Sequence, residues 1–308
     1  MATYFLRYTL HVKKLLIVGI LPITLLFAGC GVQNSTILPK PSDRLSVVTS
    51  FYPLYEIAMK VGGAHVTVRN LVPAGAEPHD YEPSPKDVIA MNQAKLVLYN
   101  GAGLESWADK IIPDLEKAGV ATLNESITSE EAPGTDPHTW LDPNQYIEEV
   151  RGVAKKLAEI DPPRAIKYQQ NADAFINGLA DLDASYKDGL KTCEMRYFVT
   201  NHAAFSYLSK RYGLEMIPIA GLSPDAEPSP KTLINLTNLI EQKGIKYILV
   251  ETLVSPKVAE VLARETGAQT LVLNPLEGLT QEEMDAGKNY ISIMRDNLTN
   301  LKAALQCR

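Results

Sequence analysis

A long stretch without proline separates two halves of the chain that share one pattern. Residues 164–190 contain no proline, and Pro162 and Pro163 stand just before them, where proline is compatible with the first turn of a helix. The apolar side chains of this stretch recur near helical spacing: Ile166, Phe175, Leu179, Leu182 and Tyr186. A helix of this length would extend for about 40 Å, the span of a whole domain. We therefore expect a single long helix that joins two lobes.

Strand-like and helix-like segments alternate on both sides of that helix. The strand-like segments are residues 45–50, 66–72, 96–99 and 120–123 before it, and 196–199, 216–219, 247–251 and 269–273 after it. Helix-like segments lie between them, including residues 105–118, which should break or end near Pro113, and residues 281–305 at the C-terminus. This rhythm predicts an α/β fold of two lobes joined by one long rigid helix. Each lobe should hold a mostly parallel four-stranded sheet flanked by helices.

The same pattern sets the expected domain boundaries. The N-terminal α/β lobe should span residues 45–161, the linker helix residues 162–191, and the C-terminal α/β lobe residues 192–308. A total of 308 residues suits two medium-sized domains. Because a helical linker is stiff, we expect small movements of the lobes rather than a wide hinge.

The first thirty residues have the layout of an export signal. Three basic residues, the last of them Lys14, precede an uncharged apolar run at residues 15–28. This run is shorter than the roughly 20 residues that span a bilayer comfortably, and it ends in small residues. Both features favour a cleaved signal peptide at residues 1–29, and an uncleaved membrane anchor is the alternative.

The residue after the expected cleavage point is a cysteine. The segment LFAGC resembles the lipobox of bacterial lipoproteins, with Phe27 where leucine is commoner. Cys30 is therefore the expected lipidation site, and residues 30–44, which are polar and contain two prolines, should form a flexible tether. A lipid chain at Cys30 would hold the exported protein at the outer face of the plasma membrane, or in the periplasm.

The charge and the remaining cysteines limit the class of protein further. Without residues 1–29 the chain keeps 27 basic and 36 acidic residues, a formal charge of −9, which argues against a nucleic-acid binder. Cys193 and Cys307 lack the CxxC spacing of metal sites. An oxidising compartment allows a disulfide between them, which would fasten the C-terminal end to the start of the second half. Two free thiols are the alternative.

Three histidines share one kind of position. His79 lies in the loop after the second expected strand, His138 in a proline-rich loop, and His202 just after a strand. Ligands of open α/β sheets gather at the carboxyl ends of strands, so these loops could converge in a cleft between the two halves. His65 follows two glycines in a turn, where a solvated side chain is expected.

The chemistry of these residues suits a transition metal. Three neutral imidazoles fit zinc, copper or nickel better than calcium or magnesium, which prefer oxygen ligands. Zinc sites commonly add a carboxylate, and Glu277 in LNPLEGL, near another strand end, is available for that role. Spacing alone leaves two readings open: one shared metal site, or solvated loop histidines with no common ligand.

Six motifs resemble those of one family, the zinc/manganese-binding solute-binding lipoproteins of ABC transporters. In chain order they are PAGAEPHDYEPSP, NGAGLESW, DPHTWLDPN, TNHAAFSYLSKRYGL, GLSPDAEPSP and LNPLEGLT. The resemblance covers essentially the whole mature chain. It implies two α/β lobes joined by one rigid helix with the metal between them. It also implies a monomer that delivers the metal to an importer made of a permease and an ATPase.

The resemblance also implies a ligand set of His79, His138, His202 and a fourth, acidic residue. In part of the family the fourth ligand is an aspartate, where this chain has Asn274, a weak neutral ligand. Members with the NPLEG form use the glutamate, so Glu277 is the expected fourth ligand.

The third ligand position indicates the metal. Manganese-binding members tend to carry glutamate where this chain has His202, so three nitrogens and one carboxylate favour zinc. Zinc-specific relatives often have a histidine-rich loop between the first two ligands, whereas residues 80–137 contain no histidine. Manganese is therefore kept as the alternative cargo.

Polar neighbours of the expected ligands are candidates for orienting them. Asp80, Asp136 and Asp142 could accept a hydrogen bond from a ligand's second ring nitrogen, and Asn274 lies close to Glu277 in sequence. For the aspartates, capping of turns is the alternative.

Two other functions can be framed from the same residues. A secreted zinc hydrolase needs an open metal position and a general base, for which Glu77 and Asp80 are candidates. However, the chain has no HExxH motif and its ligands are scattered. Some relatives are described as adhesins, and adhesion could coexist with metal binding.

Overall fold

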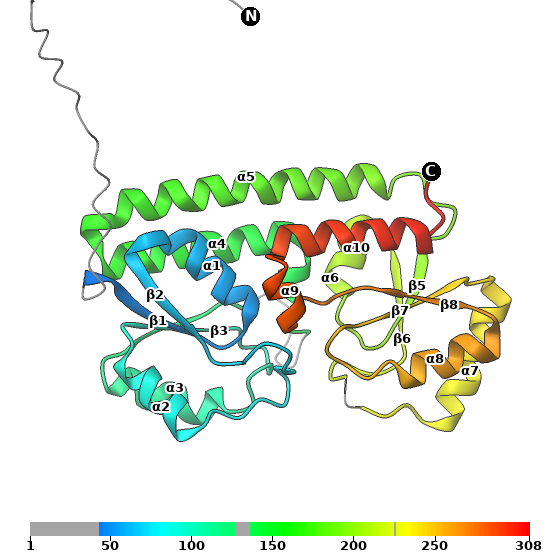
Figure 1. Ribbon diagram of the computed structural model, residues 1–308, viewed down its shortest axis with the longest axis horizontal. Coiled ribbons are helices and arrows are strands. Elements are labelled where there is room, and N and C mark those ends of the chain that lie inside the picture. The colour runs from blue at the N-terminus through cyan, green and yellow to red at the C-terminus, as the bar shows by residue number, and fades with distance from the viewer. Residues whose placement is uncertain (1–42, 127–135, 225) are drawn as a thin grey trace, which may run out of the picture. The chain divides into compact units, whose positions relative to one another are not determined.

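The strands of the described chain form two separate parallel sheets (Figure 1). The computed structural model describes residues 43–126, 136–224 and 226–308, so the expected signal peptide, Cys30 and nearly all of the tether lie outside the described residues. The first sheet has the order β2-β1-β3-β4. The second has the order β6-β5-β7-β8. The strands are β1 (Leu45–Thr49), β2 (Val66–Asn70), β3 (Leu96–Tyr99), β4 (Ala121–Asn124), β5 (Tyr197–Thr200), β6 (Glu215–Pro218), β7 (Tyr247–Val250) and β8 (Gln269–Val272).

Helices follow the strands and flank both sheets (Figure 1). They are α1 (Tyr52–Gly62), α2 (Pro85–Gln93), α3 (Ala108–Lys117), α4 (Pro143–Ile160), α5 (Ala165–Gly189), α6 (Ser206–Tyr212), α7 (Pro230–Lys243), α8 (Lys257–Thr266), α9 (Gln281–Asp285) and α10 (Tyr290–Ala304). Short 3-10 turns at Gly63–His65, Thr139–Leu141 and Pro162–Arg164 complete the connections. The predicted fold class, two α/β lobes joined by a long helix, is confirmed.

Local sequence signals begin several of these helices. Ser84 and Asp87 form a capping box around the first turn of α2, with Pro85 at its first position. Ser229 caps α7 in the same way, accepting a hydrogen bond from the Thr232 N–H. The central strands are apolar on both faces, as expected for parallel sheets covered by helices.

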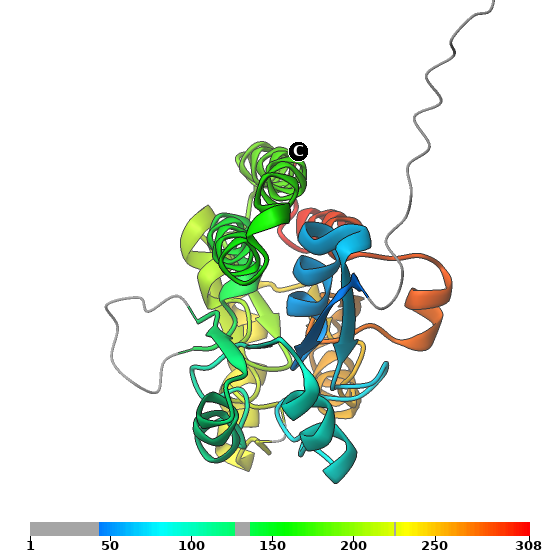
Figure 2. The same cartoon turned by 90° about the vertical axis from the view of Figure 1, so that its left-hand side faces the viewer.

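The long helix α5 runs along both lobes and packs against α4 and α10 (Figures 1 and 2). Its buried residues recur every three or four positions: Tyr168, Ala172, Phe175, Leu179, Leu182 and Tyr186. A Cβ at Gly178 would come within 3.0 Å of the Ile291 side chain, so glycine lets α10 approach closely. Tyr186 donates a hydrogen bond to the carbonyl of Met294 across the same contact. One apolar core extends through both lobes and α5, which makes the connection stiff.

Two helix predictions were wrong in detail. The C-terminal segment 281–305 is two helices, because Gly287 adopts a left-handed φ of 69° and Asn289 then caps α10. Pro113 neither ends nor breaks its segment but lies inside α3. In the described part of the chain, no helix combines the length and apolar character needed to cross a membrane.

Candidate metal centre

Four loops at the carboxyl ends of strands bring His79, His138, His202 and Glu277 together. His79 follows β2 and His138 follows β4, both in the first lobe. His202 follows β5 and Glu277 follows β8, both in the second. Because parallel strands end at the same edge of their sheet, each lobe contributes two side chains from one edge. The cluster therefore lies between the lobes.

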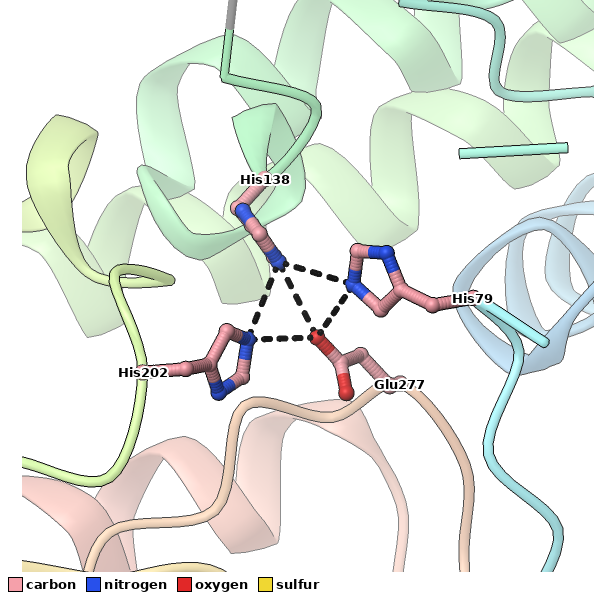
Figure 3. A group of neighbouring side chains, drawn as sticks. All are labelled: His79, His138, His202 and Glu277. Atoms are coloured by element: carbon pink, nitrogen blue, oxygen red, sulfur yellow. Dashed lines mark hydrogen bonds and ion pairs between the residues drawn. The ribbon is translucent and has the colours of Figure 1, made fainter. Parts of the chain in front are cut away.

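The four side chains point their ligand atoms at one another (Figure 3). The Nε2 atom of His138 lies 3.3 Å from Nε2 of His79 and 3.3 Å from Nε2 of His202. Oε1 of Glu277 lies 3.0 Å from His138, 3.2 Å from His202 and 3.4 Å from His79, measured to each Nε2. In a tetrahedral zinc site with bonds of about 2.0–2.1 Å, ligand atoms stand about 3.3 Å apart. The spacing of the cluster matches that geometry.

The backbone around each ligand is held in place by hydrogen bonds. Trp140 donates from its ring nitrogen to the carbonyl of Pro275, and this 2.7 Å bond links the His138 loop to the Glu277 loop across the lobes. Leu276, next to Glu277, has a positive φ of 59°, and the Asn274 side chain accepts the Leu276 N–H at 2.7 Å. A strained turn of this kind persists where its surroundings fix it, and here it presents Glu277 to the cluster.

The cluster is almost sealed from solvent. The side chains of His138, His202 and Glu277 are 0% exposed, whereas that of His79 keeps 9%. The ring of Trp140 packs 5.2 Å from that of His138, measured between centroids, and contributes an apolar wall. A cation at the centre would be largely stripped of bulk water, and among the four side chains His79 is the one with any exposure.

Acidic partners fix which nitrogen of each buried ring faces inward. Nδ1 of His138 lies 2.6 Å from a carboxylate oxygen of Asp136, and Nδ1 of His202 lies 2.7 Å from Oε1 of Glu251. Each carboxylate accepts a hydrogen bond there, so each Nδ1–H donates, and in the neutral ring Nε2 turns a lone pair toward the centre. Two such lone pairs repel at 3.3 Å unless a cation or a proton lies between them.

The electrostatic surroundings favour positive charge at the centre. Burial by itself would raise the pKa of Glu277, but hydrogen bonds from His138, His202 and His79 outweigh it and hold the pKa well below its usual range. Burial would lower the pKa of His202, yet the hydrogen bonds to Glu251 and Glu277 raise it to about 10. The pKa of His138 is likewise raised, because its two carboxylate partners overcome the effect of burial.

One oxygen of the cluster has no hydrogen bond and could bind a metal. Oε2 of Glu277 is buried and has no hydrogen-bond partner among the described residues. An uncompensated buried carboxylate oxygen is costly, and a cation bound by the same carboxylate would reduce that cost. Three imidazole nitrogens with one carboxylate fit zinc by ligand type and by spacing.

The other residues singled out from the sequence have different contacts. Asp142 caps α4 through the Asn144 N–H and pairs with Arg211 at 3.1 Å, so it joins the lobes instead of orienting a ligand ring. Asn274 does not face the cluster, because its side chain shapes the turn before Glu277. Asp80 is exposed beside His79. Asp136 is bonded to the ring of His138.

Two acidic neighbours of the cluster make contacts that the sequence did not predict: Glu251, and Glu77, which the sequence offered only as a candidate general base. Glu251 follows β7, which pairs with β5, and this pairing places Glu251 against His202. Strand order is not readable from the sequence, although an acidic residue at a strand end was a usable signal. Glu77 accepts the backbone N–H of His79 at 3.2 Å. Burial and the charge of Glu277 raise the pKa of Glu77 to about 9.

The disulfide joins two residues that are not members of the cluster. Cys193 follows α5 and is bonded to Cys307 near the C-terminus, so the end of α10 is tied to the start of the second lobe. The pairing closes a loop with a sequence separation of 114.

Comparison with known proteins gives a family match over nearly the whole described chain. The family model described as zinc-uptake complex component A periplasmic, ZnuA, matches residues 47–304. The high-affinity zinc uptake system protein ZnuA of Bacillus subtilis is 38% identical over 304 residues, covering 91% of this chain and 94% of that protein. The zinc-binding lipoprotein AdcA of Streptococcus pneumoniae is 39% identical over 277 residues, and the matched region covers 84% of this chain but 55% of that protein.

Solved structures agree with the sequence relatives. The zinc-bound ZnuA-like domain of Streptococcus pneumoniae AdcA superposes with a TM-score of 0.77 at 41% identity, covering 85% of this chain and 99% of that one. The laminin-binding protein Lmb of Streptococcus agalactiae, described as an adhesin with metal-transporting activity, has a TM-score of 0.77 at 36% identity over the same shares of the two chains.

Proposed function

The chain belongs to the ZnuA family of zinc-uptake components, and on that premise we propose that it is an extracytoplasmic solute-binding protein that captures one zinc ion and delivers it to an ABC importer. The observation that carries the proposal is the convergence of three Nε2 atoms and one carboxylate oxygen, all within 4.8 Å of one another. These atoms all carry lone pairs that are turned toward one another in a buried space, and a cation at the centre would offset their mutual repulsion.

Zinc is the proposed cargo, with His79, His138, His202 and Glu277 as its ligands. Three nitrogens and one oxygen match the preference of zinc, whereas manganese prefers oxygen-rich sites. Spacings of 3.0–3.4 Å between donor atoms suit a compact tetrahedral ion. Two relatives are zinc proteins by name, which supports the same choice.

Export and membrane attachment follow from the N-terminal sequence. Relatives are described as periplasmic or as lipoproteins, consistent with an exported protein. We propose that residues 1–29 are removed, that Cys30 carries the lipid, and that residues 30–44 tether the protein to the membrane. As a monomer it would then meet a permease, driven by an ATPase, at the outer face of the plasma membrane or in the periplasm.

The lobe boundaries proposed from the sequence fit this role. Residues 45–161 and 192–308 would form the two lobes that enclose the metal, and residues 162–191 would form the stiff linker helix between them. Bonds between the lobes, such as that from Trp140 to Pro275, would have to break for the cleft to open and release its cargo.

The family is a transport family and not an enzyme family, and we propose that this chain has no hydrolase activity. A catalytic zinc usually keeps three protein ligands and an open position for water, whereas four protein donors converge here. The likeness to a laminin-binding protein is the reason to test laminin binding alongside zinc binding.

The test is a metal titration of the purified protein after chelation. We expect one zinc ion per chain, and displacement of manganese by zinc when both are offered. A zinc stoichiometry near zero would refute the proposal. Preferential retention of manganese would show that manganese, and not zinc, is the cargo.

A further inference from the structure

A cavity of about 400 Å³ is lined by residues that neighbour His79 and His202 in sequence. Its walls come from both lobes: Glu77 and Asp80 from the first, and Asn201, Glu227, Leu253 and Lys257 among those from the second. Glu77 and Asp80 flank His79 in sequence, and Asn201 precedes His202. The cavity therefore reaches the backbone of two proposed ligands from outside.

The loop of Glu277 comes close to one wall of the same cavity. A Cβ at Gly278, the residue after Glu277, would lie 3.2 Å from the side chain of Leu253, which lines the cavity, and 3.5 Å from the carbonyl of Ala76. His79, between the lining residues Glu77 and Asp80 in sequence, is the cluster member that keeps some exposure. The partly exposed member of the cluster therefore lies on a loop that lines the cavity.

Glu77 has an unused acceptor at this boundary. One oxygen of its carboxylate accepts the His79 N–H, while the other is buried and bonded to nothing in the part of the chain that the structure describes. Two other buried oxygens also have no hydrogen-bond partner among the described residues. They are Oε2 of Glu251, a residue that is 6% exposed, and Oδ1 of Asn201. Buried oxygens without donors are rare in folded proteins, and a passing cation or its hydration water would satisfy them.

We propose that this cavity is the route by which the cation enters and leaves, and that Glu77 is a transit ligand whose free oxygen binds the incoming ion before it passes to His79. The inference rests on the proposed zinc binding and adds a site outside the four ligands. Among the other lining residues, the carboxylates of Asp80 and Glu227 outnumber the ammonium of Lys257, so the described wall has a net negative charge that attracts a divalent cation.

A transit ligand has a kinetic signature. Because Glu77 would bind the ion between solution and the final site, it lowers the barrier in both directions. Its loss therefore slows association and dissociation by similar factors, and the equilibrium affinity changes much less than either rate.

The test compares rates of zinc binding in the detergent-solubilised full chain and in Glu77→Gln. Glutamine keeps an amide oxygen for the His79 N–H, so the backbone contact survives and only the second carboxylate oxygen is lost. Zinc association is followed by stopped-flow tryptophan fluorescence, since Trp140 packs against His138. Dissociation is followed by capture of zinc with a chelator. We expect Glu77→Gln to slow both about tenfold.

Two further variants make the result specific. Glu265→Gln makes the same substitution at an exposed position on α8 outside the cavity and should leave both rates unchanged. Lys257→Gln removes the cation from the cavity wall and should speed association. Unchanged rates in both Glu77→Gln and Lys257→Gln would overturn the inference, as would faster dissociation in Glu77→Gln, which would make Glu77 part of the final site. A chain that binds no zinc at equilibrium would instead refute the proposed function.

Discussion

Oε1 of Glu251 holds His202 at two points, accepting its Nδ1–H at 2.7 Å and its backbone N–H at 3.2 Å. The carboxylate thereby fixes both the orientation of the ring and the nitrogen that faces the metal centre. Glu251 contributes nothing to the donor set itself, so its effect on metal binding must pass through His202.

Glu251→Gln should weaken zinc binding by about 10- to 100-fold without changing the stoichiometry. The amide can still accept a hydrogen bond, but it lacks the charge that makes His202 a strong donor to the metal. Competition with a zinc chelator of known affinity measures the change. Glu260→Gln, an exposed position on α8, is the control. Equal affinity in Glu251→Gln and wild type would show that His202 needs no carboxylate partner.

Removal of a proposed ligand should have a larger effect than removal of its supporting carboxylate. His138→Ala should lower zinc affinity by more than about 100-fold, because the ring contacts all three other members of the cluster. His65→Ala is the matched control, since His65 lies in a turn outside the cluster. Zinc-induced stabilisation against heat, measured for both variants, should vanish in the first and persist in the second. Similar losses in the two variants would point to unfolding as the cause.

The fourth ligand can be tested by a ranking. Glu277→Ala should weaken zinc binding more than Asn274→Ala, because Glu277 faces the three imidazoles and Asn274 bonds to backbone and to Glu283. Asn274→Ala should instead lower the melting temperature of the metal-free protein, since it removes the support of a strained turn. The opposite order of zinc affinities would assign the fourth position to Asn274.

The fold was predictable from the sequence because its signals are local. Proline-free helical spacing predicted α5, and β-branched runs between helices predicted eight strands in the chain that is described. The break between α9 and α10 was missed because apolar residues keep helical spacing on both sides of Gly287. The break depends on the positive φ of that single residue. Pro113 was misjudged because a helix tolerates proline when packing outweighs the lost hydrogen bond.

The site was predictable only in part. His79, His138, His202 and Glu277 stood out because each follows a strand and matches a family motif, and the structure brings them together. Glu251 did not stand out, because its role depends on the pairing of β7 with β5, which connects segments about fifty residues apart. Asp142 looked like a neighbour of His138 but pairs with Arg211 of the other lobe. Contacts set by topology were therefore the ones that the sequence could not supply.

An ion pair between α5 and α6 should make stability depend on acid. Arg211 lies 2.7 Å from Asp183, whose side chain is 13% exposed. Burial would raise the pKa of Asp183, but hydrogen bonds from Arg211, Lys187 and Tyr212 lower it to about 2. Since this value lies below that of an unfolded aspartate, near 4, the stabilisation is complete above pH 4 and is lost as the pH falls toward 2.

Asp183→Asn should accordingly cost about 1 kcal/mol of unfolding free energy at pH 7, after allowance for solvent screening. The difference from wild type should shrink between about pH 4 and pH 2. Urea unfolding at a series of pH values measures it. Asp181→Asn, an exposed neighbour on α5, should show no such dependence. A deficit that stays constant down to pH 2 would mean that the charge of Asp183 is not its cause.

Coordination of one zinc ion by residues of both lobes can be seen directly in a crystal structure of the zinc-loaded protein, with anomalous diffraction recorded at the zinc absorption edge. We expect one strong anomalous peak between the lobes, about 2.0–2.2 Å from Nε2 of His79, His138 and His202 and from a carboxylate oxygen of Glu277. A peak located elsewhere, or a zinc ion held by only some of these four side chains with water completing its shell, would contradict it.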